Sequence, residues 1–137
     1  MPEEAPEITR NPPLSETDKM TVEAQTLLIN QRAYEKDFPA DVITDKDDKD
    51  AQDLKKKQNR ERDYRLDLFD HAERFANNQP YDTDQAKQGL DFAYTIASAR
   101  AANAKKQPDN ALAATKDMTI IAGLRVKLSD KISASGN

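Results

Sequence analysis

The 137-residue sequence contains no cysteine and no tryptophan, and it has only three glycines and one histidine. Without cysteine the chain forms no disulfide, offers no thiolate to a metal and has no cysteine nucleophile. The glycines, Gly89, Gly123 and Gly136, are too few and too far apart for a glycine-rich phosphate-binding loop. Walker-type and Rossmann nucleotide sites are therefore excluded.

Apolar residues are also scarce. Hydrophobic residues make up 36% of the chain and charged residues 34%, whereas typical domains have about 45–50% and about 25%. The longest apolar run, Met118 to Leu128, is interrupted by Gly123, Arg125 and Lys127, and the N-terminus lacks the basic and apolar regions of a signal peptide. We expect a soluble protein without membrane contact, in the cytoplasm or in a virus particle or other large assembly formed there.

The single histidine, His71, limits the chemistry further. Metal sites in helical bundles draw on several histidine and carboxylate ligands, and a serine nucleophile of the hydrolase type needs a G-x-S-x-G turn, which is absent. Asp67 lies one helical turn before His71, at the edge of an apolar face, where its carboxylate is expected to favour the protonated ring. We therefore expect a protein that is not an enzyme, with no catalytic residue, no cofactor and no metal.

The proline pattern and the apolar periodicity divide the chain. Four of the seven prolines, Pro2, Pro6, Pro12 and Pro13, stand in residues 1–14, which indicates an extended or flexible acidic arm. Residues 15–133 are predicted to form a helical bundle, and 134–137 a short tail. The predicted helices run from Ser15 to Phe38, from about Asp48 to Ala76, from Asp82 or Thr83 to Ala104, and from about Asn110 to Ile132.

Apolar spacing supports these helices. In the first, apolar and aromatic residues recur every three or four positions, and Pro39 ends the run. The third carries an alanine-rich stripe, which predicts a tight helix–helix contact: Ala86, Leu90, Ala93, Ala97, Ala101 and Ala104. Gly89 and Gly123 lie inside predicted helices, where we attribute both to close helix approach. No strand pattern competes, and the short links favour antiparallel neighbours.

The sequence therefore predicts an all-α fold: an elongated three- or four-helix antiparallel bundle with an extended Pro-rich N-terminal arm. The long second helix contains a dense charged block. Between Leu54 and Tyr64 it has no apolar residue, so this part either projects into solvent or meets a polar partner. Its candidate contact residues for a partner or for nucleic acid are Lys55, Lys56, Lys57, Arg60, Arg62 and Tyr64.

Two interpretations of this block compete. Clustered cations with an aromatic neighbour are typical of phosphate-backbone binding. Against this, charges of alternating sign recur every four residues, which indicates a solvated helix with salt bridges along one face. The members of this charge ladder are Lys49, Asp53, Lys57, Glu61 and Arg65.

Three functions remain open at this stage. The first is a non-enzymatic helical assembly or interaction protein, such as a structural component of a viral particle, that binds a protein partner or itself. The second is a nucleic-acid-binding helical protein that uses residues 55–65. The third is a small acidic inhibitor or regulator of another protein, consistent with the net charge of -4.

Overall fold

The computed structural model describes residues 20–104 and 107–135. The predicted N-terminal arm, the proposed helix start at Ser15 and most of the predicted C-terminal tail lie outside these residues. The described part contains four α-helices and no strand: α2 (Val22–Asp37), α3 (Lys49–Ala76), α4 (Thr83–Asn103) and α5 (Pro108–Ser135). The predicted all-α fold is confirmed.

Side-chain caps fix three of the helix starts. Thr21, Asp48 and Asp82 adopt extended backbone conformations, and each accepts a hydrogen bond from the backbone N–H three residues later. These bonds satisfy donors that the first helical turn leaves unpaired. The predicted starts near Asp48 and Asp82 are confirmed, but α2 begins after Thr21, so a helix continuous from Ser15 is wrong.

The last helix is longer than predicted at both ends. It starts at Pro108, since proline is tolerated in the first turn, where the missing N–H has no helical partner. It continues to Ser135, two residues beyond the predicted end of the bundle.

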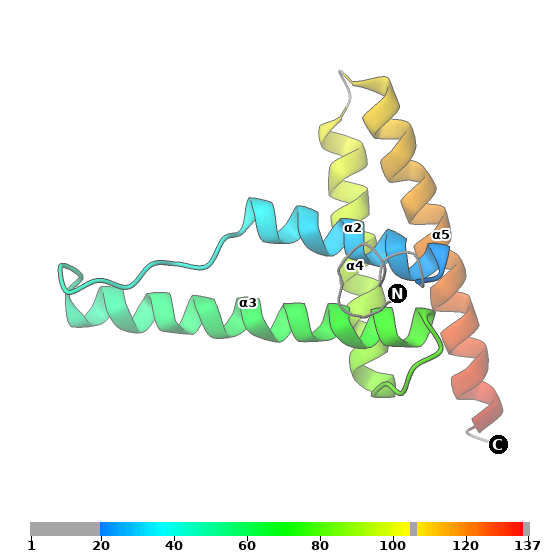
Figure 1. The fold of residues 1–137 in the computed structure, drawn as a ribbon, viewed down its shortest axis with the longest axis horizontal. Helices are drawn as coiled ribbons and strands as arrows, with labels where there is room; N and C mark the ends of the chain where they lie inside the picture. The colour runs from blue at the N-terminus through cyan, green and yellow to red at the C-terminus, as the bar shows by residue number, and fades with distance from the viewer. Residues whose placement is uncertain (1–19, 105–106, 136–137) are drawn as a thin grey trace, which may run out of the picture.

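The four helices form two pairs that cross steeply (Figure 1). In each pair the chain runs out along one helix and returns along the other, so α2 lies antiparallel to α3 and α4 lies antiparallel to α5. The pairs meet over the second half of α3, and the first half of α3 extends beyond the crossing. The described part of the chain is thus a bundle of two antiparallel helix pairs, and its elongation comes mainly from α3.

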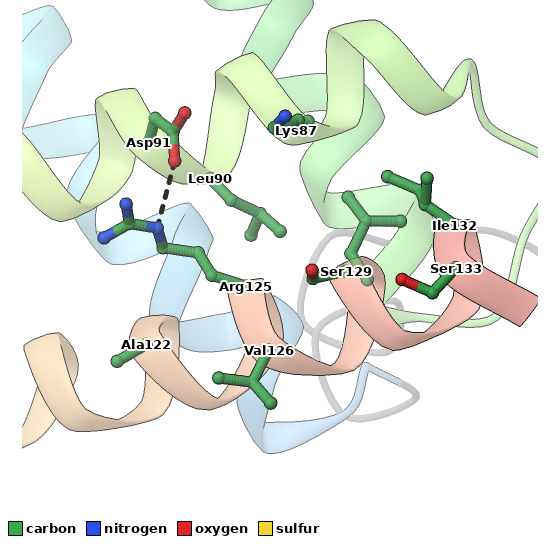
Figure 2. A pocket seen from close by; sticks show the side chains of 10 residues that line it. Lys87, Leu90, Asp91, Ala122, Arg125, Val126, Ser129, Ile132 and Ser133 are labelled. Carbon is green, nitrogen blue, oxygen red and sulfur yellow. Dashed lines mark ion pairs between the residues drawn. The ribbon is translucent and has the colours of Figure 1, made fainter.

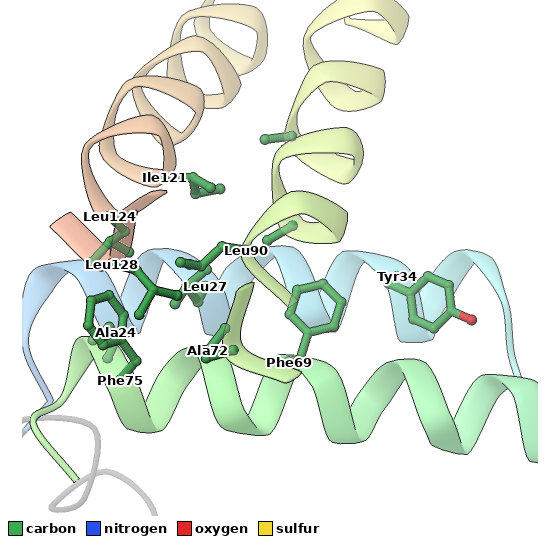
Figure 3. Packing of buried hydrophobic residues seen from close by; sticks show 14 residues of the cluster. Ala24, Leu27, Tyr34, Phe69, Ala72, Phe75, Leu90, Ile121, Leu124 and Leu128 are labelled. Carbon is green, nitrogen blue, oxygen red and sulfur yellow. The ribbon is translucent and has the colours of Figure 1, made fainter. Parts of the chain in front are cut away.

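The core lies at the crossing of the two pairs. Side chains from all four helices meet there (Figure 3). The largest fully buried apolar side chains are Phe69 of α3, Leu27 of α2, Leu90 of α4, and Ile121 and Leu128 of α5.

Aromatic rings extend this core toward the projecting half of α3. Phe92 of α4 meets Tyr34 of α2 and Phe69 of α3 edge to face, with ring centroids 5.2 and 5.6 Å apart. Such edge-to-face pairs are favourable because the positive ring edge meets the negative face.

Three large apolar residues of the predicted helices are exposed in the structure. Phe38 is 57% exposed because it follows the end of α2 and stacks only on Tyr34. Val126 is 62% exposed because it lies on the side of α5 away from the core. Ile132 lies on the same side of the helix as Ile121 and Leu128, but one turn past the last buried residue, and it is 38% exposed at the edge of the core. The buried face of α5 is formed by Ala114, Ile121, Leu124 and Leu128.

The crossing of α3 and α4 is unusually close. A Cβ added to Gly89 would overlap the carbonyl oxygen of Leu68 and would lie 3.1 Å from the Cβ of Ala72. The alanine-rich stripe predicted to make a tight contact is largely buried here, at Ala86, Ala93 and Ala97.

The two helical glycines therefore differ. The explanation given for Gly89 is confirmed, since another helix lies directly against it. For Gly123 the explanation is wrong, because that residue is exposed and nothing lies within 4 Å of an added Cβ.

A buried polar cluster ties α2 to the other pair. Asn30 of α2 is fully buried, and its Oδ1 accepts a 2.7 Å hydrogen bond from Arg100 Nη1 of α4. The same guanidinium nitrogen lies 2.7 Å from Asp117 Oδ2 of α5, which also accepts from Asn30 Nδ2. Because each member depends on the others, the cluster fixes the position of α2 on α4 and α5.

The two glycines provide a matched test of the close crossing. Gly89→Ala should destabilise the protein by at least about 1–3 kcal/mol, because the added methyl group must push α3 and α4 apart. Gly123→Ala should instead stabilise it by up to about 1 kcal/mol, because alanine is the better helix former and the site is open. Chemical denaturation of both variants measures the difference, and equal effects would contradict the close crossing.

Candidate interaction site

The most distinctive surface is the part of α3 that leaves the core. We call residues 38–63 the α3 projection: it consists of the connector 38–48 and the first half of α3. Figure 1 shows the connector running back along this half of the helix while α4 and α5 lie at the other end. The projection is therefore a helix with one extended segment of chain beside it, and it has no hydrophobic core of its own.

Polar side chains of α3 hold the connector in place. Asn59 forms a pair of bonds with Asp41: its Oδ1 accepts from the Asp41 N–H at 2.8 Å, and its Nδ2 donates to the Asp41 carbonyl at 3.1 Å. Arg62 Nε donates to the carbonyl of Phe38, and Gln52 Nε2 donates to the carbonyls of Thr44 and Asp47. Backbone groups that would have no secondary-structure partner are thus satisfied by side chains.

Lys55 provides the charged part of the same contact. Its Nζ donates to the Val42 carbonyl at 3.0 Å and lies 2.9 Å from Asp47 Oδ2. The hydrogen bond from Lys55, together with one from the Thr44 N–H, lowers the pKa of Asp47 below its ordinary value. Asp47 therefore stays ionised and keeps the loop closed on the helix.

The six candidate contact residues do not share one surface. Lys55 and Arg62 face the connector, and the hydroxyl of Tyr64 donates to Gln88 Oε1 of α4. The remaining three point to solvent and make no ion pair or hydrogen bond in the described part of the chain: Lys56, Lys57 and Arg60. The block predicted from the sequence is therefore divided between bracing of the connector and an exposed face.

Sequence reasoning missed the bracing of the connector: Lys55 and Arg62 were candidates for contact with a partner, and Gln52 and Asn59 were not singled out. Gln52, Lys55, Asn59 and Arg62 recur at spacings of three, four and three, which places them on one side of a helix. This is the spacing of an apolar seam, here occupied by long polar side chains. The sequence did contain a signal for this contact: a polar seam on the predicted helix, preceded by a connector rich in aspartate.

The charge ladder is exposed but does not form the expected bridges. Lys49, Asp53, Lys57 and Glu61 lie on the side of α3 away from the connector, and within residues 20–104 no neighbouring pair of them reaches ion-pair distance. Arg65, the last member, lies over the ring of Phe92 at 5.5 Å. The four exposed members are free to meet charges outside the chain.

Several apolar side chains also project from this region. On the connector, Val42 is 73% exposed, and Phe38 and Ile43 are exposed as well; on the other side of α3, Leu54 is 55% exposed. The projection carries eight acidic and seven basic residues, so it has almost no net charge. Such a surface suits a protein better than a phosphate backbone, which requires a positive excess.

His71 lies in a small acidic group in the second half of α3, beside the turn to α4. Ligand atoms of Asp67, Asp70 and His71 lie within 4.8 Å of one another. However, His71 Nδ1 accepts a 3.0 Å hydrogen bond from the backbone N–H of Asp82, the residue that caps α4. Nδ1 thus uses its lone pair, and in the neutral ring the proton is on Nε2. The imidazole stabilises the α3–α4 turn, and with Nδ1 used in this way the neutral ring offers no free lone pair to a metal.

Glu73 has the most perturbed carboxyl group in the described residues. Its Oε2 is buried and has no hydrogen-bond partner there. Burial, together with the nearby carboxylates of Asp70 and Glu35, raises the pKa of Glu73 to about 8, and Arg32 opposes this shift. Near neutral pH the folded protein therefore holds this group in its protonated form.

A groove of about 510 Å³ lies between α4 and α5 (Figure 2). Leu90, Val126 and Ile132 supply its apolar wall. At one end Asp91 Oδ1 pairs with Arg125 Nε at 3.0 Å, which occupies the carboxylate that lines the groove. The hydroxyls of Ser129 and Ser133 line it as well, but its lining includes no histidine to activate them.

The chain was compared with protein families, curated proteins and solved structures, and nothing matches in any of the three. Among the described residues, no helix combines the length and the apolar character needed to cross a bilayer.

The connector contact predicts a local effect. Asn59→Ala removes both bonds to Asp41, so the Asp41 amide should exchange with solvent faster, while amides of the core helices keep their rates. Gln58→Ala, on an exposed neighbour, is the control and should leave Asp41 unchanged. Hydrogen exchange followed by NMR measures both, and an unchanged rate in Asn59→Ala would contradict the bracing contact.

Glu73 predicts a pH dependence of stability. Between pH 4.5 and about 8 the unfolded chain releases the Glu73 proton and the folded chain keeps it. The free energy of unfolding should therefore fall as pH rises through this window, by at most about 1.4 kcal/mol per pH unit from this group. Glu73→Gln should flatten the fall in urea titrations at several pH values, whereas Asp130→Asn, at an exposed site, should not.

Proposed function

We propose that the protein is a non-enzymatic helical interaction protein, a component of a larger assembly, that binds through the α3 projection. The observation that carries this proposal is the construction of the projection: α3 continues for about four turns beyond the core, and the connector is bonded along it. A helix end that gains no tertiary packing is expected to fray, because helical propensity alone stabilises a short segment only weakly. Here dedicated polar contacts keep it ordered.

The surface chemistry supports a protein as the bound molecule. Protein interfaces combine apolar anchors with polar surroundings, and Val42 and Leu54 supply exposed apolar side chains among mixed charges. Nucleic-acid binding is the alternative. It is less well supported, because Lys55 and Arg62 are used inside the chain and the projection has no positive excess. An assembly such as a viral particle remains a setting for the proposed function.

Site-specific photocrosslinking tests the proposal. The full chain carries a photoreactive residue at position 42, and a matched chain carries it at Leu112, which is 58% exposed on α5. We expect discrete protein adducts from position 42 in extracts of the native source, and none from position 112. Equal labelling from both positions would contradict the proposal, and adducts removed by nuclease would favour nucleic acid.

A further inference from the structure

The exposed face of α3 continues the face that packs on α4. An α-helix repeats its direction after 18 residues, which is five turns. Asp50, Leu54 and Lys57 therefore point the same way as Leu68, Ala72 and Phe75, which are buried, with Leu68 and Ala72 directly against Gly89 of α4. Within the described residues no helix lies on the first half of this face, and the side chains that hold the connector, such as Asn59, point to the opposite side.

The charges on this face are self-complementary. Suppose that α3 of a second copy lies antiparallel to the first, with the two-fold axis at the height of residue 55. Each residue then lies opposite the residue of the other copy for which the two residue numbers sum to 110. Asp53, at the edge of this face, then meets Lys57 of the other copy, and symmetry repeats the pair. Both side chains are exposed and make no ion pair or hydrogen bond in the described part of the chain.

We propose that two copies of the chain pair through this face, antiparallel, with Leu54 packed against its symmetry mate beside the two-fold axis. The pairing names the partner of the α3 projection as a second copy, and so rests on the proposed function. Symmetric two-fold contacts of this kind are the commonest form of self-association. Charge pairing sets the register, and the leucine supplies the apolar centre.

Three other registers are unfavourable. An axis at Lys57 sets that lysine against itself and Asp53 against Glu61, and an axis at Asp53 places like charges together in the same way. An axis at position 59 restores opposite charges, but it brings the start of α3 of the other copy against residue 69. Helix α4 occupies that place, since Tyr64 bonds to Gln88 and Arg65 covers Phe92.

Charge reversal with mixing tests the pairing. Asp53→Lys places lysine opposite Lys57, and Lys57→Glu places glutamate opposite Asp53, so each variant alone should dissociate at least about tenfold more readily. Mixed in equal amounts, the two variants regain opposite charges at both positions and should form a mixed dimer. Sedimentation of the full chain over a concentration series at low salt measures this, with circular dichroism to confirm folding.

Two controls sharpen the result. Lys116→Glu makes the same charge change at an exposed site on α5 and should leave self-association unchanged. Raising the salt toward about 1 M shortens the screening length to about 3 Å and should weaken the wild-type dimer. Failure of the mixture to associate, or a wild-type chain that stays monomeric at every concentration, overturns the pairing. If position 42 still crosslinks to another protein in that case, the proposed function stands and only the second copy is refuted.

Discussion

The contact on which the rest of the fold depends is the crossing of α3 and α4 at Gly89. Only a residue without a side chain permits the Leu68 carbonyl to approach so closely. The small side chains of Ala86, Ala93 and Ala97 extend the close approach along α4. Close packing matters here because apolar residues are few, and a small core gains stability only when its atoms are in full contact. With α3 and α4 fixed, α5 packs on α4, and α2 closes the core through the buried Asn30–Arg100–Asp117 cluster.

The position of this crossing also creates the projection. Because α4 meets α3 at its second half, the first half of the helix gains no tertiary burial, and helical propensity alone stabilises it weakly. The connector compensates with hydrogen bonds from Gln52, Lys55, Asn59 and Arg62 to its carbonyls. The projection is thus stabilised by polar contacts where the rest of the molecule uses apolar ones. Its outer face remains available.

The sequence was sufficient for the features that arise within single helices. Pro39, the caps Asp48 and Asp82, and the alanine stripe are local signals, and the helices and the close contact at Gly89 follow from them. Features that require the arrangement of helices could not be obtained in this way. Nothing in the pattern around Gly123 distinguishes an exposed glycine from a packed one. The division of the basic block likewise depends on where the connector runs, and the burial of Glu73 depends on where α2 lies.

Spacing explains how the first half of α3 presents two different surfaces. Residues that alternate at three and four positions stay on one side of a helix, so Gln52, Lys55, Asn59 and Arg62 follow the connector over its whole length. The charge ladder advances by four positions, and each step turns it by about 40° around the axis, since 3.6 residues make a full turn. Such a stripe faces one neighbour for only a few steps. The proposed pairing uses the step from Asp53 to Lys57; by Arg65 the stripe has reached the part of α3 that α4 covers.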